Sequence, residues 1–273
     1  MPVPTTLSIV IVSYNAREDL VRCLVSLHAT PPSMAHDITV VDNASTDGGV
    51  DVVRARWPHV QVIVQDRNRG FAAANNAGIR ATHGDLLLLL NSDTIVPAGA
   101  LDTLVERLLA SNTVAAAGPR LVGPDGRIEI SFGRMISPLN ELRQKTIGRL
   151  YDAGLAPVTR WIEHSTRLER YVDWVSGACL LVTRADAEAV GLLDERYFLY
   201  TEDVDFCAAL RARGRQILYT PSAEVIHARG RSRASAPGQM NAEYRRSQVA
   251  FYEKHHPAWA PVLKTYLRLR GQA

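Results

Sequence analysis

Short apolar runs alternate with amphipathic segments over the first 120 residues. The runs Leu7–Ser13, Asp37–Asp42 and Val60–Gln65 are rich in β-branched residues and predict strands. The most apolar run lies within Asp85–Thr94, where five consecutive leucines precede Asn-Ser-Asp. A run that short and that apolar is typical of a strand buried on both faces, as at the centre of a parallel sheet. Val114–Ala117 is a further expected strand.

Helices are expected between these strands, because apolar residues recur there at helical spacing. Asn15 can cap a first helix with leucines on one face, and a short helix ends at Pro58. Phe71–Ala81 is alanine-rich, and Pro97 suits the first turn of a fourth helix. This alternation predicts parallel β-α-β units. The expected fold is therefore α/β, with a Rossmann-like, mostly parallel central sheet flanked by helices.

The second half of the chain has a weaker pattern. Gly123–Gly126 signals a turn compatible with a hairpin, and Ile128–Asp173 is interpreted as a loop-and-helix insertion. The further expected elements are a strand at Trp174–Thr183, a short helix capped by Thr183, a helix from about Val204 to Gly214, strands at Gln216–Thr220 and Ala223–His227, and a helix from Asn241 that Pro257 and Pro261 break. We expect one domain over 1–233, with a nucleotide-binding half (1–120) and an acceptor-side, catalytic half (121–233), and a helical tail over 234–273.

The composition excludes several classes of protein. Of 273 residues, 47% are apolar and 22% charged, which argues against disorder, and a net charge of +3 is too small to indicate nucleic-acid binding. Cys23, Cys179 and Cys207 are odd in number and widely spaced, which favours reduced thiols and a cytoplasmic protein. No apolar run approaches a membrane span, and the first six residues lack the basic segment of a signal peptide.

Basic residues gather in the last quarter of the chain. Six basic residues and one acid lie between Arg245 and Arg270, a pattern that suits an anionic substrate or membrane surface. A peripheral contact with the inner face of the cell membrane is one expectation for this tail. An ordinary terminal helix that packs on the domain is the other.

Two polar loops follow expected strands in the first half. Asp42, Asn43 and Asp47 can present carboxylates and an amide to a base and ribose, and an Asx-type turn that caps the next helix is the alternative. In the second loop, Gly70 lets the backbone approach a ligand and Arg69 can contact phosphate. An ordinary loop is the alternative there.

Three further positions suit metal binding and acid–base chemistry. Asp93, after the leucine run, can bind Mg²⁺ or Mn²⁺, with a turn acid as the alternative. The acids of Glu202–Asp205 follow aromatic residues. Mutual repulsion and partial desolvation raise the pKa of such carboxyls, which suits a general base. They also complement the dipole of the helix that follows. His227 is a candidate metal ligand or a surface histidine beside a basic loop with Arg229, Arg231 and Arg233.

Together, and in this order and spacing, the motifs resemble family 2 of the glycosyltransferases, which have the GT-A fold. The resemblance covers Leu7 to about Arg233. Asn91 stands at the first acid of the family's DxD motif, where rhamnosyltransferase-like members commonly have Asn. The segments that carry the resemblance are Ser8–Asn15, Val41–Gly48, Asn68–Phe71, Leu90–Asp93, Trp174–Ala178, Phe198–Asp205 and His227. The sequences around Phe198–Asp205 and His227 are similar to those of bacterial rhamnosyltransferases of cell-wall and O-antigen assembly.

The resemblance implies an inverting, divalent-metal-dependent transfer of a sugar, with dTDP-rhamnose as the expected donor within a dTDP- or UDP-sugar class. The implied acceptor is a glycan or a polyprenyl-diphosphate-linked glycan. Asp203 is implied as the catalytic base beside Glu202, and Asp93 and His227 as ligands of Mg²⁺ or Mn²⁺. The implied donor-binding residues are Ser13, Asn15, Asp42, Asn43, Asp47, Asn68, Arg69, Gly70, Asn75, Asn91 and Ser92. The implied acceptor and sugar pocket consists of Trp174, Ser176, Gly177, Ala178 and Tyr200.

Two other classes of protein fit part of this pattern. A sugar-1-phosphate nucleotidyltransferase also has a nucleotide-binding α/β half, but it usually opens with a glycine-rich loop, and here the first strand runs into Ser13–Asn15. A non-catalytic sugar-nucleotide or glycan-binding domain is disfavoured by the intact acids at 42, 93 and 203.

Overall fold

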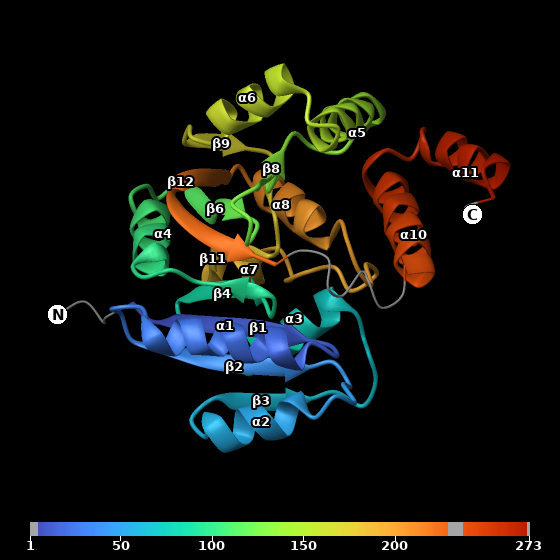
Figure 1. The fold of residues 1–273 in the computed structure, drawn as a ribbon. Coiled ribbons are helices and arrows are strands. Elements are labelled where there is room, and N and C mark those ends of the chain that lie inside the picture. The colour runs from blue at the N-terminus through green and yellow to red at the C-terminus, as the bar shows by residue number, and fades with distance from the viewer. Residues whose placement is uncertain (1–4, 229–236, 272–273) are drawn as a thin grey trace.

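The computed structural model describes residues 5–228 and 237–271, and the leucine strand lies at its centre (Figure 1). Strand β4 (Leu86–Asn91) pairs in parallel with β1 (Leu7–Ser13) and antiparallel with β11 (Cys179–Thr183). Its five leucines are at most 2% exposed, and alternate leucines face two different cores. The prediction of a strand buried on both faces is therefore confirmed.

Ten strands of the described chain form a mixed central sheet. Strands β3 (Gln61–Val64), β2 (His36–Asp42), β1 and β4 form a parallel block. Strand β11 then lies antiparallel between β4 and β6 (Val114–Val122), and β12 (Gln216–His227) is parallel to β6. This insertion of β11 departs from the simple alternation that the sequence predicts. The short strands β5 (Thr94–Ile95), β7 (Ile128–Glu129) and β9 (Arg170–Val172) complete the sheet.

Helices cover both faces of the sheet, as predicted for an α/β fold (Figure 1). One core is formed with α1, α2 and α4, and the other with α3, α7 and α8. Their bounds are α1 Arg17–Ala29, α2 Gly49–Arg56, α4 Ala100–Leu109, α3 Phe71–Arg80, α7 Arg184–Ala189 and α8 Glu202–Ala212. Helix α8 begins two residues earlier than expected, so the acidic motif forms its first turn.

The segment interpreted as an insertion contains two helices and three short strands. Helix α5 (Pro138–Asp152) begins after Ser137, whose hydroxyl accepts a hydrogen bond from the Asn140 N–H, and α6 is Ala156–Ser165. Strands β7 and β9 join the central sheet, and β8 (Phe132–Gly133) pairs with β10 (Trp174–Val175) in a separate two-stranded sheet.

The expected single strand at Trp174–Thr183 is wrong. The chain turns at Ser176–Ala178 between β10 and β11, because backbone groups in this turn bond outside the sheet. The Ser176 N–H donates to the Ser131 carbonyl and the Gly177 N–H to the Asp203 carboxylate. By contrast, the two strands expected over Gln216–His227 are one strand, β12, with an irregularity between Thr220 and Glu224.

The tail contains α10 (Pro237–His255) and α11 (Ala260–Leu269). The predicted break near Pro257 is confirmed, whereas Pro261 lies in the first turn of α11. The tail packs on the segment before α8 through a third core, formed by Tyr197, Val204, Phe251, Tyr252 and Ala260. Within the described residues, none of the helices has the length and apolar character needed to cross a membrane.

Candidate functional site

The carboxyl ends of β1, β2 and β4 lie at one edge of the parallel block, and candidate residues follow each of them. In open α/β sheets this edge is where ligands bind. The Asn43 N–H donates to the carbonyl of Ser13, which joins the ends of β1 and β2. Asp42 and Asn43 are both 3% exposed, and the Asp42 carboxylate accepts from the Ser45 N–H. These contacts hold the two polar side chains in a fixed turn.

Asn15 supports this turn and does not cap α1 as expected. Its backbone is left-handed (φ 47°), its N–H donates to the Ser45 hydroxyl, and its side-chain oxygen accepts from the Thr46 N–H. Asp47 takes the capping role. Its carboxylate accepts from the Arg17 N–H at the start of α1 and from the Gly49 N–H at the start of α2. The capping interpretation of Asp47 therefore has direct structural support.

The loop with Asn68, Arg69 and Gly70 is bonded to Asn43. The Asn43 amide donates to the Asn68 side-chain oxygen (2.8 Å) and accepts from the Arg69 N–H (2.8 Å). Gly70 has φ 85°, and a Cβ there would lie 2.4 Å from the carbonyl oxygen of Phe198. The loop therefore needs glycine to lie against the segment that precedes α8.

Helix α3 carries two buried asparagines with different contacts. The Asn75 amide donates to the Phe71 carbonyl of its own helix, and its buried Oδ1 has no hydrogen-bond partner among the described residues. Asn76, which follows Asn75 in the same sequence motif but is not among the implied donor-binding residues, donates to the Leu193 carbonyl and to Glu195. Asn76 thus ties α3 to the segment before α8, and its place beside Asn75 was the only available signal.

The end of β4 meets the end of β12. Asp93 Oδ1 lies 3.1 Å from His227 Nε2, and the Asn91 amide nitrogen lies 3.3 Å from the same ring nitrogen. The adjacent Ser92 is buried, and the Asp93 carbonyl accepts from the Ala228 N–H. The structure therefore brings together Asn91, Asp93 and His227, which lie far apart in the sequence. Arg229, Arg231 and Arg233 lie outside the described residues.

His227 is held between two carboxylates. Its Nδ1 lies 2.7 Å from Glu129 Oε2, a contact that the sequence analysis missed. Burial lowers the pKa of this imidazole, but hydrogen bonds to Asp93 and Glu129 outweigh it and raise the pKa to about 9. No group of three or more His, Cys, Asp or Glu residues that could hold a metal ion occurs in the described part of the chain. Asp93 and His227 are thus two available ligands.

The acidic motif begins α8 after two residues in left-handed conformation, Tyr200 (φ 70°) and Thr201 (φ 65°). Asp203 accepts from the Gly177 N–H (2.9 Å) and from the Val204 N–H (2.8 Å). Burial raises the pKa of the Asp203 carboxyl, and these N–H donors oppose that shift. A carboxylate with a raised pKa and fixed orientation suits proton abstraction.

Glu202 differs from its neighbour in solvation. It is 5% exposed, and its Oε2 has no hydrogen-bond partner within the described chain. Burial, followed by repulsion from Asp203, raises the pKa of Glu202 well above its usual value. Burial thus raises the pKa of both acids, and the Asp203 carboxylate has N–H donors that oppose the shift.

The turn between β10 and β11 connects the two parts of the candidate site. Gly177 donates to Asp203, and the Ala178 carbonyl accepts from the Asn91 N–H (2.9 Å). The Ser176 hydroxyl accepts from the Ala178 N–H within the turn. Trp174 donates from its indole to the Arg134 carbonyl, and the Tyr200 ring lies 5.7 Å from that of Tyr244. A single turn thus bonds both Asp203 and the end of β4.

A buried ionic cluster attaches α10 to α8. The Asp205 carboxylate lies 2.8 Å from Lys254 Nζ and 2.6 Å from His255 Nε2, and accepts a hydrogen bond from the Tyr197 hydroxyl. Lys254 also bonds Asp194. Sequence analysis placed Asp205 within the motif but did not identify its partners, because they come from a distant helix.

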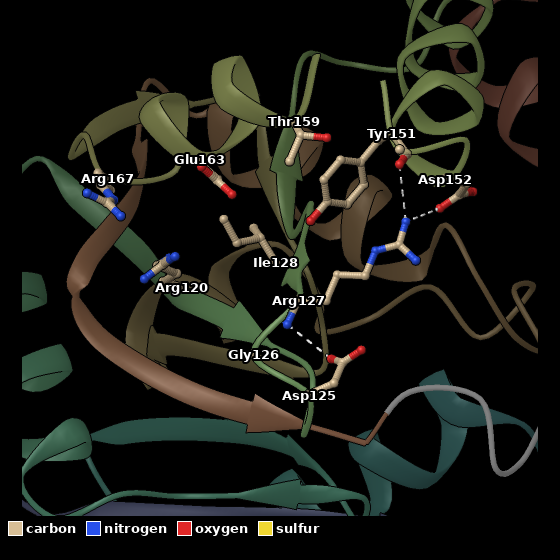
Figure 2. A pocket seen from close by; sticks show the side chains of 11 residues that line it. Arg120, Asp125, Gly126, Arg127, Ile128, Tyr151, Asp152, Thr159, Glu163 and Arg167 are labelled. Carbon is tan, nitrogen blue, oxygen red and sulfur yellow. Dashed lines mark hydrogen bonds and ion pairs between the residues drawn. The ribbon is translucent and has the colours of Figure 1, made fainter. Parts of the chain in front are cut away.

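Two cavities lie outside this arrangement. One, of about 560 Å³, is lined by Arg120, Arg127, Tyr151 and other polar residues of the second half (Figure 2). Figure 2 shows Arg127 directed at Asp152, so its charge is already paired. The other, of about 360 Å³, lies beside the Asp205–Lys254 pair. Asp205 of the predicted acidic motif lines the second cavity, whereas the implied catalytic, donor, acceptor and metal residues line neither of the two.

Comparison with known proteins decides the family. A family model described as glycosyl transferase family 2 matches residues 8–162. The chain belongs to glycosyltransferase family 2. This glycosyltransferase is 31% identical, over 97% of its own length and 89% of the relative's, to an N-acetylglucosaminyl-diphospho-decaprenol L-rhamnosyltransferase of Mycobacterium tuberculosis. It is 27% identical, over 95% of its length, to an O-antigen biosynthesis protein of Myxococcus xanthus, of which it spans 20%.

Solved structures support the GT-A fold of this glycosyltransferase. A mannosyltransferase from Pyrobaculum calidifontis in complex with GDP-Man and Mn²⁺ aligns with a TM-score of 0.64 at 17% identity, over 96% of this chain and 69% of the other. GalNAc-T7 with UDP, GalNAc and Mn²⁺ aligns with a TM-score of 0.62 at 18% identity, over 82% and 43%. The predicted family, fold and enzyme class are confirmed.

Proposed function

We propose that this glycosyltransferase transfers rhamnose, with inversion, from dTDP-rhamnose to a hydroxyl of a lipid-linked glycan. The observation that carries the proposal is the position of Asp203. Two backbone N–H groups orient its carboxylate, and the turn that supplies one of them also bonds the end of β4. The similarity to the mycobacterial rhamnosyltransferase supports the sugar and the class of acceptor.

In the proposed reaction, Asp203 takes the proton from the acceptor hydroxyl as that oxygen attacks the anomeric carbon. The bond from the anomeric carbon to the phosphate oxygen breaks on the opposite face, and the nucleoside diphosphate leaves. General-base catalysis of this kind contributes roughly 10²–10⁴-fold to the rate. Burial raises the pKa of Glu202, which favours its protonated form, and in that form it would offer a hydrogen-bond donor beside the base.

Asp93 and His227 would hold a divalent metal. A carboxylate oxygen and an imidazole nitrogen fit Mn²⁺, and the carboxylate fits Mg²⁺, so the donor set suits the predicted ions. When bound, the metal would neutralise charge on the leaving diphosphate. With two protein ligands, the site depends on oxygens of the nucleotide to complete it. Asp93→Ala should therefore weaken nucleotide binding in the presence of Mn²⁺ more than in its absence.

We assign the donor to the edge where β1, β2 and β4 end. Asp42 and Asn43, held by the contacts of Asn15 and Asn68, would face the base and ribose. Ser13 and Gly70 support this edge through backbone groups, Asp47 through its carboxylate, and Asn75 through helix α3. The donor side further includes Arg69, Asn91 and Ser92, and the acceptor side Trp174, Ser176, Gly177, Ala178 and Tyr200.

A lipid-linked acceptor places the reaction at a membrane surface, and α11 suits such a surface. Its exposed apolar residues follow one stripe along the helix: Trp259, Val262, Tyr266 and Leu269. The helix carries basic residues and no acid between Ala260 and Leu269. Apolar side chains flanked by basic ones favour contact with anionic lipid.

A panel of donors tests the proposed function. The full chain is incubated with dTDP-rhamnose, UDP-sugars and GDP-sugars, a lipid-linked acceptor, and Mg²⁺ or Mn²⁺, and both transfer and hydrolysis are measured. Preferential transfer from dTDP-rhamnose supports the proposal. Preference for another donor overturns the rhamnosyl assignment. Pyrophosphate release from a nucleoside triphosphate and a sugar phosphate would indicate a nucleotidyltransferase, and nucleotide binding without turnover a non-catalytic domain.

A further inference from the structure

We propose that Glu129 is a positioning residue that fixes His227 in the tautomer able to bind the metal. The inference rests on the proposed role of His227 as a metal ligand. An imidazole binds a metal through an unprotonated nitrogen, and the hydrogen bond at its other nitrogen determines which one that is. Here Nε2 faces Asp93, and Nδ1 faces Glu129.

The contact has the geometry of a strong, oriented hydrogen bond. The distance from His227 Nδ1 to Glu129 Oε2 is 2.7 Å, and both side chains are largely buried, at 8% and 11% exposed. A carboxylate only accepts, so Nδ1 must carry the proton that it donates. By the same reasoning Nε2 donates its own proton to Asp93 in this structure. When Nε2 gives up that proton to bind the metal, the Nδ1–H held by Glu129 leaves the Nε2 lone pair directed at the Asp93 side.

The sheet fixes both partners through its backbone. Glu129 lies opposite Leu121 of β6, and Leu121 lies opposite Val225 of β12, two residues before His227. On its other side, His227 pairs with Thr94 of β5, next to Asp93. Glu129 therefore reaches His227 across a continuous strand ladder, so the backbone pairing of the strands fixes its position.

The test compares Glu129→Gln with Glu224→Gln. Both remove the charge of a glutamate on this ladder, but Glu224 is an exposed residue paired with Arg120 and does not contact His227. The full chain is first saturated with dTDP or UDP, whichever of the two binds. Mn²⁺ is then titrated into this complex, and its affinity is measured by calorimetry. We expect a 10–100-fold weaker Mn²⁺ affinity in Glu129→Gln and an unchanged affinity in Glu224→Gln.

Two further readouts separate positioning from folding. At a pH above the His227 pKa of about 9, nitrogen NMR of the His227 ring in the metal-free protein should show the Nδ1–H tautomer in the unaltered chain and a mixture in Glu129→Gln. Glu129→Asp should restore part of the affinity, because it keeps the acceptor charge. Equal Mn²⁺ affinity in Glu129→Gln, while His227→Ala loses at least tenfold, would overturn the inference and leave the proposed function intact. Unchanged affinity in His227→Ala would overturn the inference together with the metal site.

Discussion

The substitution Asp203→Asn tests the proposed chemistry most directly. The Asp203 carboxylate accepts from the N–H groups of Gly177 and Val204. An asparagine keeps one acceptor oxygen, so it can satisfy one of these donors, and the loss of the other costs about 1–3 kcal/mol of stability. Loss of the base costs about 10²–10⁴-fold in kcat, equivalent to about 3–5 kcal/mol in the barrier. Binding of the nucleotide should remain, since we assign Asp203 to the acceptor side.

Glu202→Gln is the matched control, because it makes the same chemical change one residue earlier. Burial raises the pKa of Glu202, which favours the neutral carboxyl, so an uncharged amide of similar size is a mild replacement there. We expect less than a tenfold fall in kcat. The assay is release of nucleoside diphosphate at saturating donor and acceptor, with nucleotide affinity from calorimetry. A kcat of Asp203→Asn within threefold of the unaltered enzyme, or an equal loss in both variants, would refute the assignment of the base.

Three further predictions concern pH, backbone and membrane. As pH rises through the raised pKa of Asp203, the base ionises, so kcat/KM should increase and then level off above the ordinary range of an aspartate, and a profile without this acid limb would contradict the role. Gly70→Ala should lower both Tm and kcat, measured by thermal melting and transfer assays. Gly99→Ala is the control, because Gly99 also has positive φ but no atom lies within 4 Å of the added Cβ. It should cost only the backbone strain, about 1–2 kcal/mol of stability. Leu269→Asp should reduce flotation with anionic liposomes roughly tenfold, and Leu139→Asp, an equally exposed site on α5, should not; equal losses would place the contact elsewhere.

The pattern of apolar residues predicted the parallel block well, because each of its strands is short and continuous, and β1 and β4 are buried on both faces. The same reasoning failed at Trp174–Thr183. There the apolar run is continuous, but Gly177 leaves the sheet to donate to Asp203. Partners that come from another part of the chain override a local pattern, and a single sequence carries no sign of them.

The candidate site divides in the same way. Asp93 and His227 were predicted as partners through the family resemblance, and the structure brings their side chains to 3.1 Å. Glu129 could not have been found, because it lies in a segment of weak periodicity and reaches His227 only through the strand ladder. Asn15 was predicted to cap the helix that follows it. In the structure it instead supports the turn after β2, through Ser45 and Thr46.

The cluster around Asp205 has a consequence for recombining this enzyme with its relatives. The family match ends at residue 162, and the acidic motif ends at Asp205, yet two partners of that carboxylate belong to α10. A chimera that takes 194–205 from this chain and 250–255 from a parent without Lys and His at 254 and 255 would leave the buried Asp205 carboxylate without these partners, at a cost of about 3–5 kcal/mol. The two segments are therefore one exchangeable unit, although some fifty residues separate them along the chain.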